Sequence, residues 1–193
     1  MTTATIAHTH TPLYRVVQHG WADPTDSSYS QTVDNNRWNT RDFPALYCCC
    51  SSRVARGVVQ ERFGNDIVLE DLNPEVMPDL AEIDWNGDVV DVASLAGVKA
   101  NGFSARYPEG TTIVDCQKAA TSWHARTLDG VVCRSASLNR LGVETEWAND
   151  HQAWSEVAIF TSISRTKPKL GNRRVGPEWL AIPLHETTNY ELE

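Results

Sequence analysis

The 193-residue sequence predicts a single domain of the α+β class, with a mixed sheet and flanking helices. Four apolar runs have the length and composition of buried strands: 13–17, 45–50, 130–135 and 157–160. Residues 111–126 repeat apolar side chains at three- and four-residue steps, which is the pattern of an amphipathic helix. Strands and helices follow one another without the regular βαβ alternation of a doubly wound sheet, so we expect α+β.

Composition and charge limit the classes of function. Hydrophobic residues make up 41% and charged residues 22% of the chain, as in an ordinary globular protein. No apolar run approaches a membrane span and no signal peptide is recognisable, so we expect a cytoplasmic protein without membrane contact. The net charge of −8 argues against nucleic-acid binding, which needs a basic face. A small phosphate ligand held by a few arginines is compatible with it.

The termini differ in pattern from the rest of the chain. Residues 1–11 are rich in Thr and His without periodicity, and we expect a disordered tail. Residues 12–185 form the predicted domain. Residues 186–193 are acidic and are expected to be frayed.

The five cysteines do not have the spacing of a metal site. Cys48, Cys49 and Cys50 are adjacent on a predicted strand, where successive side chains alternate between faces and so cannot bind one metal together. Cys116 and Cys133 are isolated. We expect no metal and no disulfide, with the cysteines packed as small apolar residues.

The remaining elements are less sharply marked. Ser51 or Ser52 is a good N-cap for a helix over 53–63. The helix has an expected buried stripe: Val54, Ala55, Val58, Val59 and Phe63. Residues 66–72 and 87–92 are each expected to form a short strand or a strand–turn unit, and a last strand is expected at 179–184. Residues 164–174 carry five basic side chains and are expected to form a solvated loop that could approach a phosphate or an acidic partner.

The stretch from Asn35 to Cys50 contains the candidate ligand-binding residues. Arg37 can bind a phosphate or carboxylate through two hydrogen bonds, and Asn39 offers both donors and an acceptor. Trp38 and Tyr47 offer flat aromatic faces, each with one polar atom. The alternative interpretation is a solvated Arg–Trp pair on a surface turn.

Two other positions stand out in the predicted strands. Arg15 lies within the apolar run 13–17 and needs either a carboxylate or a ligand as its partner. Ser135 ends a predicted buried strand. No G-x-S-x-G motif surrounds Ser135, so the sequence does not support a serine hydrolase.

Taken in order, several short motifs resemble the RES domain family. They are Leu-Tyr-Arg at 13–15, Arg-Trp-Asn at 37–39, Pro-Ala-Leu-Tyr at 44–47, Gln117, Asp-Gly-Val-Val-Cys-Arg-Ser at 129–135 and Val-Ala-Ile-Phe at 157–160. The resemblance covers about residues 13–162. It implies a compact fold similar to ADP-ribosyltransferases and the activity of a toxin that degrades NAD, with an antitoxin protein as partner.

The resemblance also implies roles for individual residues. NAD would be the substrate, and its nicotinamide–ribose bond would be broken by hydrolysis or by phosphorolysis with phosphate as co-substrate. Arg15 and Arg37 would hold the pyrophosphate or ribose region, and Tyr47 would pack against the nicotinamide side. Ser135 would hydrogen-bond the ligand inside the cleft. Trp38 and Asn39 complete the expected binding set.

The sequence departs from the family at one important position. Cleavage through an oxocarbenium-like transition state needs a carboxylate near the ribose. The family has a Glu on the helix after the Tyr strand, where this sequence has Val58. Glu61 lies three residues further along, on roughly the same helix face. Glu61 either replaces the missing group as a catalytic residue or is a solvent-facing neighbour of Arg62.

Two alternatives to the NAD-cleaving enzyme remain open. One is a RES-like module, weakened or without catalysis, that binds a nucleotide or a partner protein. The other is a mono-ADP-ribosyltransferase, which follows from the analogy of fold alone. Because twofold dimers are the commonest oligomers, a homodimer is the default expectation.

Overall fold

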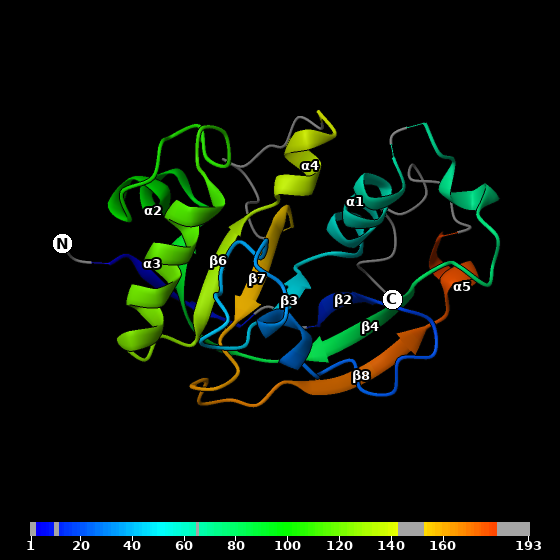
Figure 1. Cartoon of the computed structure of the whole chain (residues 1–193), viewed down its shortest axis with the longest axis horizontal. Helices are drawn as coiled ribbons and strands as arrows, with labels where there is room; N and C mark the ends of the chain where they lie inside the picture. The colour runs from blue at the N-terminus through cyan, green and yellow to red at the C-terminus, as the bar shows by residue number, and fades with distance from the viewer. Residues whose placement is uncertain (1–2, 10–11, 65, 143–152, 181–193) are drawn as a thin grey trace.

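The computed structural model describes residues 3–9, 12–64, 66–142 and 153–180, and within them the chain forms one mixed eight-stranded sheet flanked by helices (Figure 1). The strands are β1 (Thr5–His8), β2 (Leu13–Val17), β3 (Leu46–Cys49), β4 (Asp79–Asp84), β5 (Gly87–Val92), β6 (Gly130–Arg134), β7 (Ser155–Ile159) and β8 (Lys169–Arg174). The α-helices are α1 (Ser52–Phe63), α2 (Leu95–Ala100), α3 (Ile113–Ala125), α4 (Ala136–Arg140) and α5 (Gly176–Leu180). The 3-10 helices are η1 (Ser28–Gln31) and η2 (Leu69–Asp71). The predicted α+β class is confirmed.

The sheet is strongly bent. Its strand order is β1-β5-β6-β7-β3-β2-β4-β8, and all neighbours are antiparallel except β5 and β6. β4 and β5 are five strand spacings apart in this order, which is about 24 Å in a flat sheet. Only Trp85 and Asn86 connect them, and three Cα–Cα steps span at most about 11 Å. The sheet must therefore curve until these two strands approach each other.

The inner face of this curve contains its own apolar cluster. Trp85, in the β4–β5 connection, is 1% exposed and packs there with side chains from most of the strands. Its indole N–H donates to the hydroxyl of Ser164 and the carbonyl of Thr166. The polar atom of this large buried side chain is thereby satisfied, as burial requires.

The opposite face of the sheet carries the helices in two groups. α3 packs on β6 through Cys116, Ala120 and Trp123, as the predicted stripe requires. α1 packs beside β3 and β2 in a separate apolar cluster. The short helix α4 lies between α3 and α1, above the ends of β6 and β7 (Figure 1).

Most of the predicted elements are present, with shifts of one or two residues at their ends. The confirmed elements are strands β2, β3, β5, β6 and β7 and helices α1 and α3. Ser51 caps α1, since its hydroxyl accepts from the N–H of Val54. The five cysteines are free and buried, as expected.

Other predictions of local structure are wrong. Residues 5–8, expected in a disordered tail, form β1 because they pair with β5 along an otherwise open edge. Residues 69–71 form the 3-10 helix η2 rather than part of a strand. Residues 169–174, expected in a basic loop, form β8 because they pair with β4. Residues 179–180 end the helix α5, and the rest of the predicted strand 179–184, like the tail 186–193, lies outside the described residues.

None of the helices in the described ranges is long and apolar enough to cross a membrane.

Candidate active site

A cavity of about 330 Å³ opens between the loop before β3, the N-terminus of α3 and the helix α4. The residues that give it chemical character are Arg37, Tyr47, Ile113, Ser137, Arg140 and Glu156. They come from segments far apart in the sequence and include both signs of charge. The volume lies at the lower end of the range for small-molecule sites.

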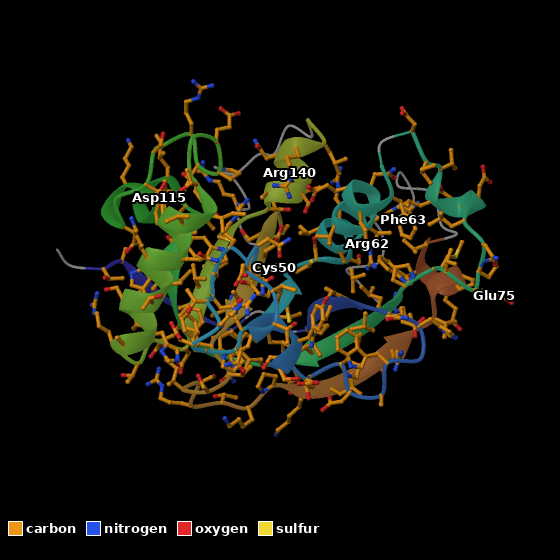
Figure 2. All side chains as sticks on the ribbon, in the orientation of Figure 1. Cys50, Arg62, Phe63, Glu75, Asp115 and Arg140 are labelled. Carbon is orange, nitrogen blue, oxygen red and sulfur yellow. The ribbon has the colours of Figure 1, made fainter. Side chains whose placement is uncertain are left out.

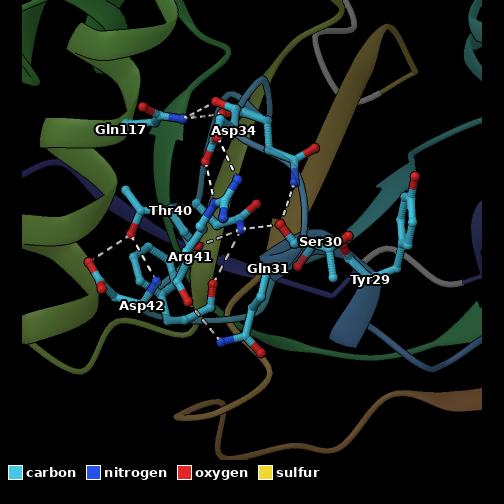
Figure 3. A network of polar contacts seen from close by, with 12 residues as sticks. Tyr29, Ser30, Gln31, Asp34, Thr40, Arg41, Asp42 and Gln117 are labelled. Atoms are coloured by element: carbon cyan, nitrogen blue, oxygen red, sulfur yellow. Dashed lines mark hydrogen bonds and ion pairs between the residues drawn. The ribbon is translucent and has the colours of Figure 1, made fainter.

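The loop at residues 34–42 is held in place by α3 and by its own polar contacts (Figure 3). Gln117 on α3 donates from Nε2 to the carbonyl oxygens of Asp34 and Asn36, at 3.0 and 2.8 Å. Arg41 forms a bidentate pair with Asp34 on the exposed side. The two Gln117 bonds orient the backbone that carries Arg37 toward the cavity, whereas the Arg41–Asp34 pair lies in solvent. Gln117 thus has a structural role next to the site.

Tyr47 joins this loop to the sheet. Its hydroxyl accepts from the backbone N–H of Trp38 at 2.8 Å and donates to Oδ1 of Asn39 at 2.9 Å. Burial raises the pKa of the Tyr47 hydroxyl, so it stays protonated. Its ring lines the cavity. The structure therefore brings Tyr47 and Arg37 to one place, as the sequence predicts.

Trp38 and Asn39 are placed mainly for structural reasons. Trp38 is 2% exposed, stacks on Trp123, and donates from its indole nitrogen to Sγ of Cys133. The amide of Asn39 is fully buried and donates to the carbonyls of Ser30, Thr40 and Phe43. Trp38 still contributes to the cavity wall, whereas Asn39 acts through Tyr47.

Arg37 is a half-buried cation with a neutral partner. Its guanidinium donates to the hydroxyl of Tyr107 at 3.5 Å, and it forms no ion pair within the described part of the chain. Two other half-buried arginines, Arg173 and Arg174, have an acid as partner, Asp79 and Glu82 respectively. Arg37 is thus available for an anion that enters the cavity.

Glu156 lines the cavity, although the sequence patterns alone do not single it out. It lies on the central strand β7, directly opposite Cys49 of β3 and Cys133 of β6. Ser135 donates its hydroxyl hydrogen to Oε1 of Glu156 at 2.6 Å. Burial raises the pKa of this carboxyl, and the Ser135 hydrogen bond and the charge of Arg37 oppose that rise.

A signal for Glu156 exists in the sequence. The apolar run 157–160 predicts a strand, and Glu156 immediately precedes it. The structure extends the strand to Ser155, which puts the carboxylate within the sheet. Alternation along a strand then places Glu156 on the same face as Ala158, the helix-covered face. An isolated acid at a strand end does not reveal that placement without the register.

Ser135 occupies a buried position at the end of β6. It is fully buried and caps α4, because its hydroxyl accepts from the N–H of Leu138. The same hydroxyl donates to Glu156. Ser135 therefore orients the carboxylate, and the direct contact with ligand expected for it stays a prediction.

Glu61, the candidate substitute carboxylate, lies next to the cavity but is already engaged. Its carboxylate pairs with Arg140 of α4, and hydrogen bonds from Arg140 and Ser137 lower its pKa despite partial burial. Arg140 projects from α4 between the positions of Asp115 on α3 and Arg62 on α1 (Figure 2). Glu61 thus links α1 to α4 at the edge of the site.

Val58 and Arg15 lie away from the cavity lining. Val58 packs, half-buried, in the apolar cluster under α1, so position 58 itself supplies no carboxylate. Arg15 faces the inner side of the bent sheet, where it donates to the carbonyl oxygens of Pro24 and Asp26 and lies over the ring of Trp21. The structure does not bring Arg15 together with Arg37. Its guanidinium stabilises the loop 20–26.

The fold and cavity define a compact α+β domain with a small ligand site that contains a cation, a carboxylate and an aromatic wall. The RES domain model matches residues 12–160, and the chain belongs to this family. No curated protein matches the sequence at a significant level. The structure is similar to a chain of the MbcT–MbcA toxin–antitoxin complex of M. tuberculosis, with a TM-score of 0.67 and 18% identity. The match covers 95% of this chain and 91% of the other.

Proposed function

We propose that the protein is an NAD-consuming enzyme that breaks the nicotinamide–ribose bond, by hydrolysis or with phosphate as co-substrate, and that it acts as a toxin restrained by an antitoxin protein. Membership of the RES family supports the assignment, as does the similarity of fold to a chain from a toxin–antitoxin complex. The charges of the cavity favour NAD as the ligand.

The observation that carries the proposal is the presence of both Arg37 and Glu156, without an ion pair between them in the described chain, in the lining of one cavity. NAD has an anionic pyrophosphate and, one ribose away, a cationic nicotinamide ring. Arg37 has no acidic partner in the described chain and can bind the pyrophosphate. Glu156 supplies negative charge for the cationic ring. A purely anionic ligand would place negative charge against Glu156, and a purely cationic ligand would place positive charge against Arg37. A ligand that carries both charges satisfies both groups.

The shape of the cavity supports binding of the nicotinamide half of the molecule. The ring of Tyr47 forms an apolar wall against which a planar ring can pack. A volume of about 330 Å³ suits nicotinamide and its ribose better than a whole dinucleotide. The adenosine half would then extend outward past the loop that carries Arg37.

The surroundings of the entrance support a protein partner. Ile113 and Val114 begin α3 and are exposed, and Ile113 also lines the cavity. Exposed apolar side chains beside a charged cavity are a suitable contact for a covering protein. An antitoxin seated there would block entry of NAD.

A second function, a module that binds nucleotide without turnover, is favoured by one observation. The helix position that holds a Glu in the family is Val58 here, and its side chain packs among apolar residues. If no other carboxylate replaces it, the cavity would bind NAD and leave it intact. Mono-ADP-ribosyl transfer has no comparable support from the site.

The test is to incubate the purified chain with NAD, with and without phosphate, and to follow free nicotinamide by chromatography. The Arg37→Ala and Glu61→Ala variants run alongside, with Arg41→Ala as a control from the same loop, where Arg41 forms an exposed pair with Asp34. We expect release by the wild type and Arg41→Ala, and loss in Arg37→Ala. Saturable NAD binding without release would establish the binding module instead. Neither binding nor release would refute the NAD assignment.

A further inference from the structure

We infer that Glu156, on the central strand of the sheet, supplies the carboxylate that faces the ribose carbon of NAD in this chain, in place of a carboxylate on α1. The inference rests on the proposed cleavage of NAD and identifies the group that performs it. It assigns Ser135 as the residue that positions Glu156.

The sheet around Glu156 does not provide a structural reason for a carboxylate, and the cations whose charges act on it, Arg37 and Arg140, both line the cavity. Its neighbours across both strands, Cys49 and Cys133, are buried, weakly polar side chains. Within the described chain it forms no ion pair, and its hydrogen-bond donor is the neutral Ser135. A partly buried carboxylate in such a place lowers stability unless it is paired. A costly group of this kind inside a cavity is typical of a functional site.

Glu61 lacks the features that this role requires. Arg140 and Ser137 already occupy its carboxylate, and its lowered pKa makes it a poor proton acceptor. It contributes to the site indirectly, because its negative charge helps to raise the pKa of Glu156. Its partner Arg140 reaches the cavity and Glu61 does not line it.

Glu156 would assist the departure of nicotinamide from the ribose. The bond from ribose C1′ to the ring nitrogen breaks, and its electron pair stays on nitrogen, so nicotinamide leaves as a neutral molecule. The positive charge that develops on the ribose is stabilised by the carboxylate. An oxygen of water or phosphate forms the new bond to C1′. In hydrolysis the proton of the attacking water moves to Glu156, whose raised pKa favours its acceptance.

The same placement has a consequence for ligand selection. The nicotinamide ring is cationic in NAD and neutral in NADH. A carboxylate in a partly buried cavity attracts the cationic ring and gains nothing from the neutral one. The wild-type site should therefore bind NAD more tightly than NADH, and this preference should depend on Glu156.

The experiment compares Glu156→Gln, Glu61→Gln and Glu82→Gln in nicotinamide release and in calorimetric affinity for NAD and NADH. Glu82 is the matched control, because it is also a half-buried strand glutamate but lies on β4, paired with Arg174. We expect Glu156→Gln to slow release by roughly 10²–10³-fold and to remove the preference for NAD. Glu82→Gln should behave as the wild type. Unchanged release by Glu156→Gln, with loss in Glu61→Gln, would overturn the inference.

A second measurement tests the positioning role of Ser135. Ser135→Ala removes the hydrogen bond that opposes the raised pKa of Glu156, so the acidic limb of the kcat/KM profile should move to higher pH. Ser51→Ala removes a comparable buried helix cap on α1 and should leave that limb in place. Equal profiles for the two variants would show that Ser135 is only a cap.

The outcomes also separate this inference from the proposed function. If the wild type binds NAD without releasing nicotinamide, cleavage is refuted. Loss of the preference for NAD in Glu156→Gln would then still support the contact between Glu156 and the cationic ring. Persistence of that preference in Glu156→Gln would refute the contact as well.

Discussion

The hydroxyl of Tyr47 donates to Oδ1 of Asn39 at 2.9 Å, which fastens the loop before β3 to the strand itself. The hydroxyl oxygen of Tyr47 also accepts a hydrogen bond from the backbone N–H of Trp38. One side chain thus provides both the wall of the cavity and the anchor of the loop that carries Arg37. The phenolic oxygen of Tyr47 thus joins Gln117 of α3 in fixing the geometry of the site.

Replacing Tyr47 with Phe should lower the stability of the fold. The change leaves the N–H of Trp38 and the amide oxygen of Asn39 without a partner in a buried place, at a cost of about 1–3 kcal/mol. Urea denaturation followed by Trp fluorescence would measure it. Tyr29→Phe is the control, because Tyr29 is exposed and loss of its hydroxyl should not change the stability of the fold. Equal midpoints for both variants would show that the loop is held by other contacts.

Arg37→Ala should weaken NAD binding by about ten- to a hundredfold, the value of a lost charge-assisted hydrogen bond. Calorimetry at low and moderate salt measures the change, and the salt dependence of binding should decrease with it. Arg41→Ala removes an exposed arginine four residues away and should bind as the wild type does. Equal affinities for the two variants would exclude Arg37 from the site.

Val58→Glu should destabilise the fold by about 1–3 kcal/mol, because it places a carboxylate in the apolar cluster under α1. We expect no gain in nicotinamide release, since Glu156 already supplies the carboxylate in our scheme. Denaturation midpoints and release rates are measured on the same preparation. A clear rise in release would mean that the cavity extends to α1 and lacks a functional carboxylate of its own.

The ionisation of Glu156 should make stability depend on pH in a defined direction. Burial raises its pKa, so the native state holds this proton more tightly than the unfolded chain does. Stability from this group is fully present at low pH and is lost as pH rises from the unfolded value of about 4 through the raised native pKa. Glu156→Gln should abolish that loss and be more stable than the wild type above this window. Urea denaturation midpoints of both proteins, measured as a function of pH, test this prediction. The same pH dependence of the midpoint in the wild type and in Glu156→Gln would contradict it.

The sequence by itself determined the class of fold and half of the cavity. The apolar runs and the helical stripe of α3 are local patterns, because burial of one face repeats with the period of the element. Arg37 and Tyr47 were recognisable because both lie near one strand, and α1 followed from its serine cap and apolar positions. These features depend on neighbours in the chain.

Only the tertiary structure decided which carboxylate enters the site. Glu156 reaches the cavity because β7 pairs with β3 and β6 in a particular register, and a shift of one residue would turn it to the opposite face. Residues 5–8 and 169–174 likewise form strands because they pair with distant partners, β5 and β4. Their own sequences do not have a clear strand pattern. Arg15 lies away from Arg37 because side chains alternate along β2 and Arg15 points to the inner face of the sheet. Glu61 of α1 forms an ion pair with Arg140 of α4. Contacts between segments far apart in the chain decide the position of Glu156, the two edge strands and the partners of Arg15 and Glu61. Local sequence patterns do not encode such contacts.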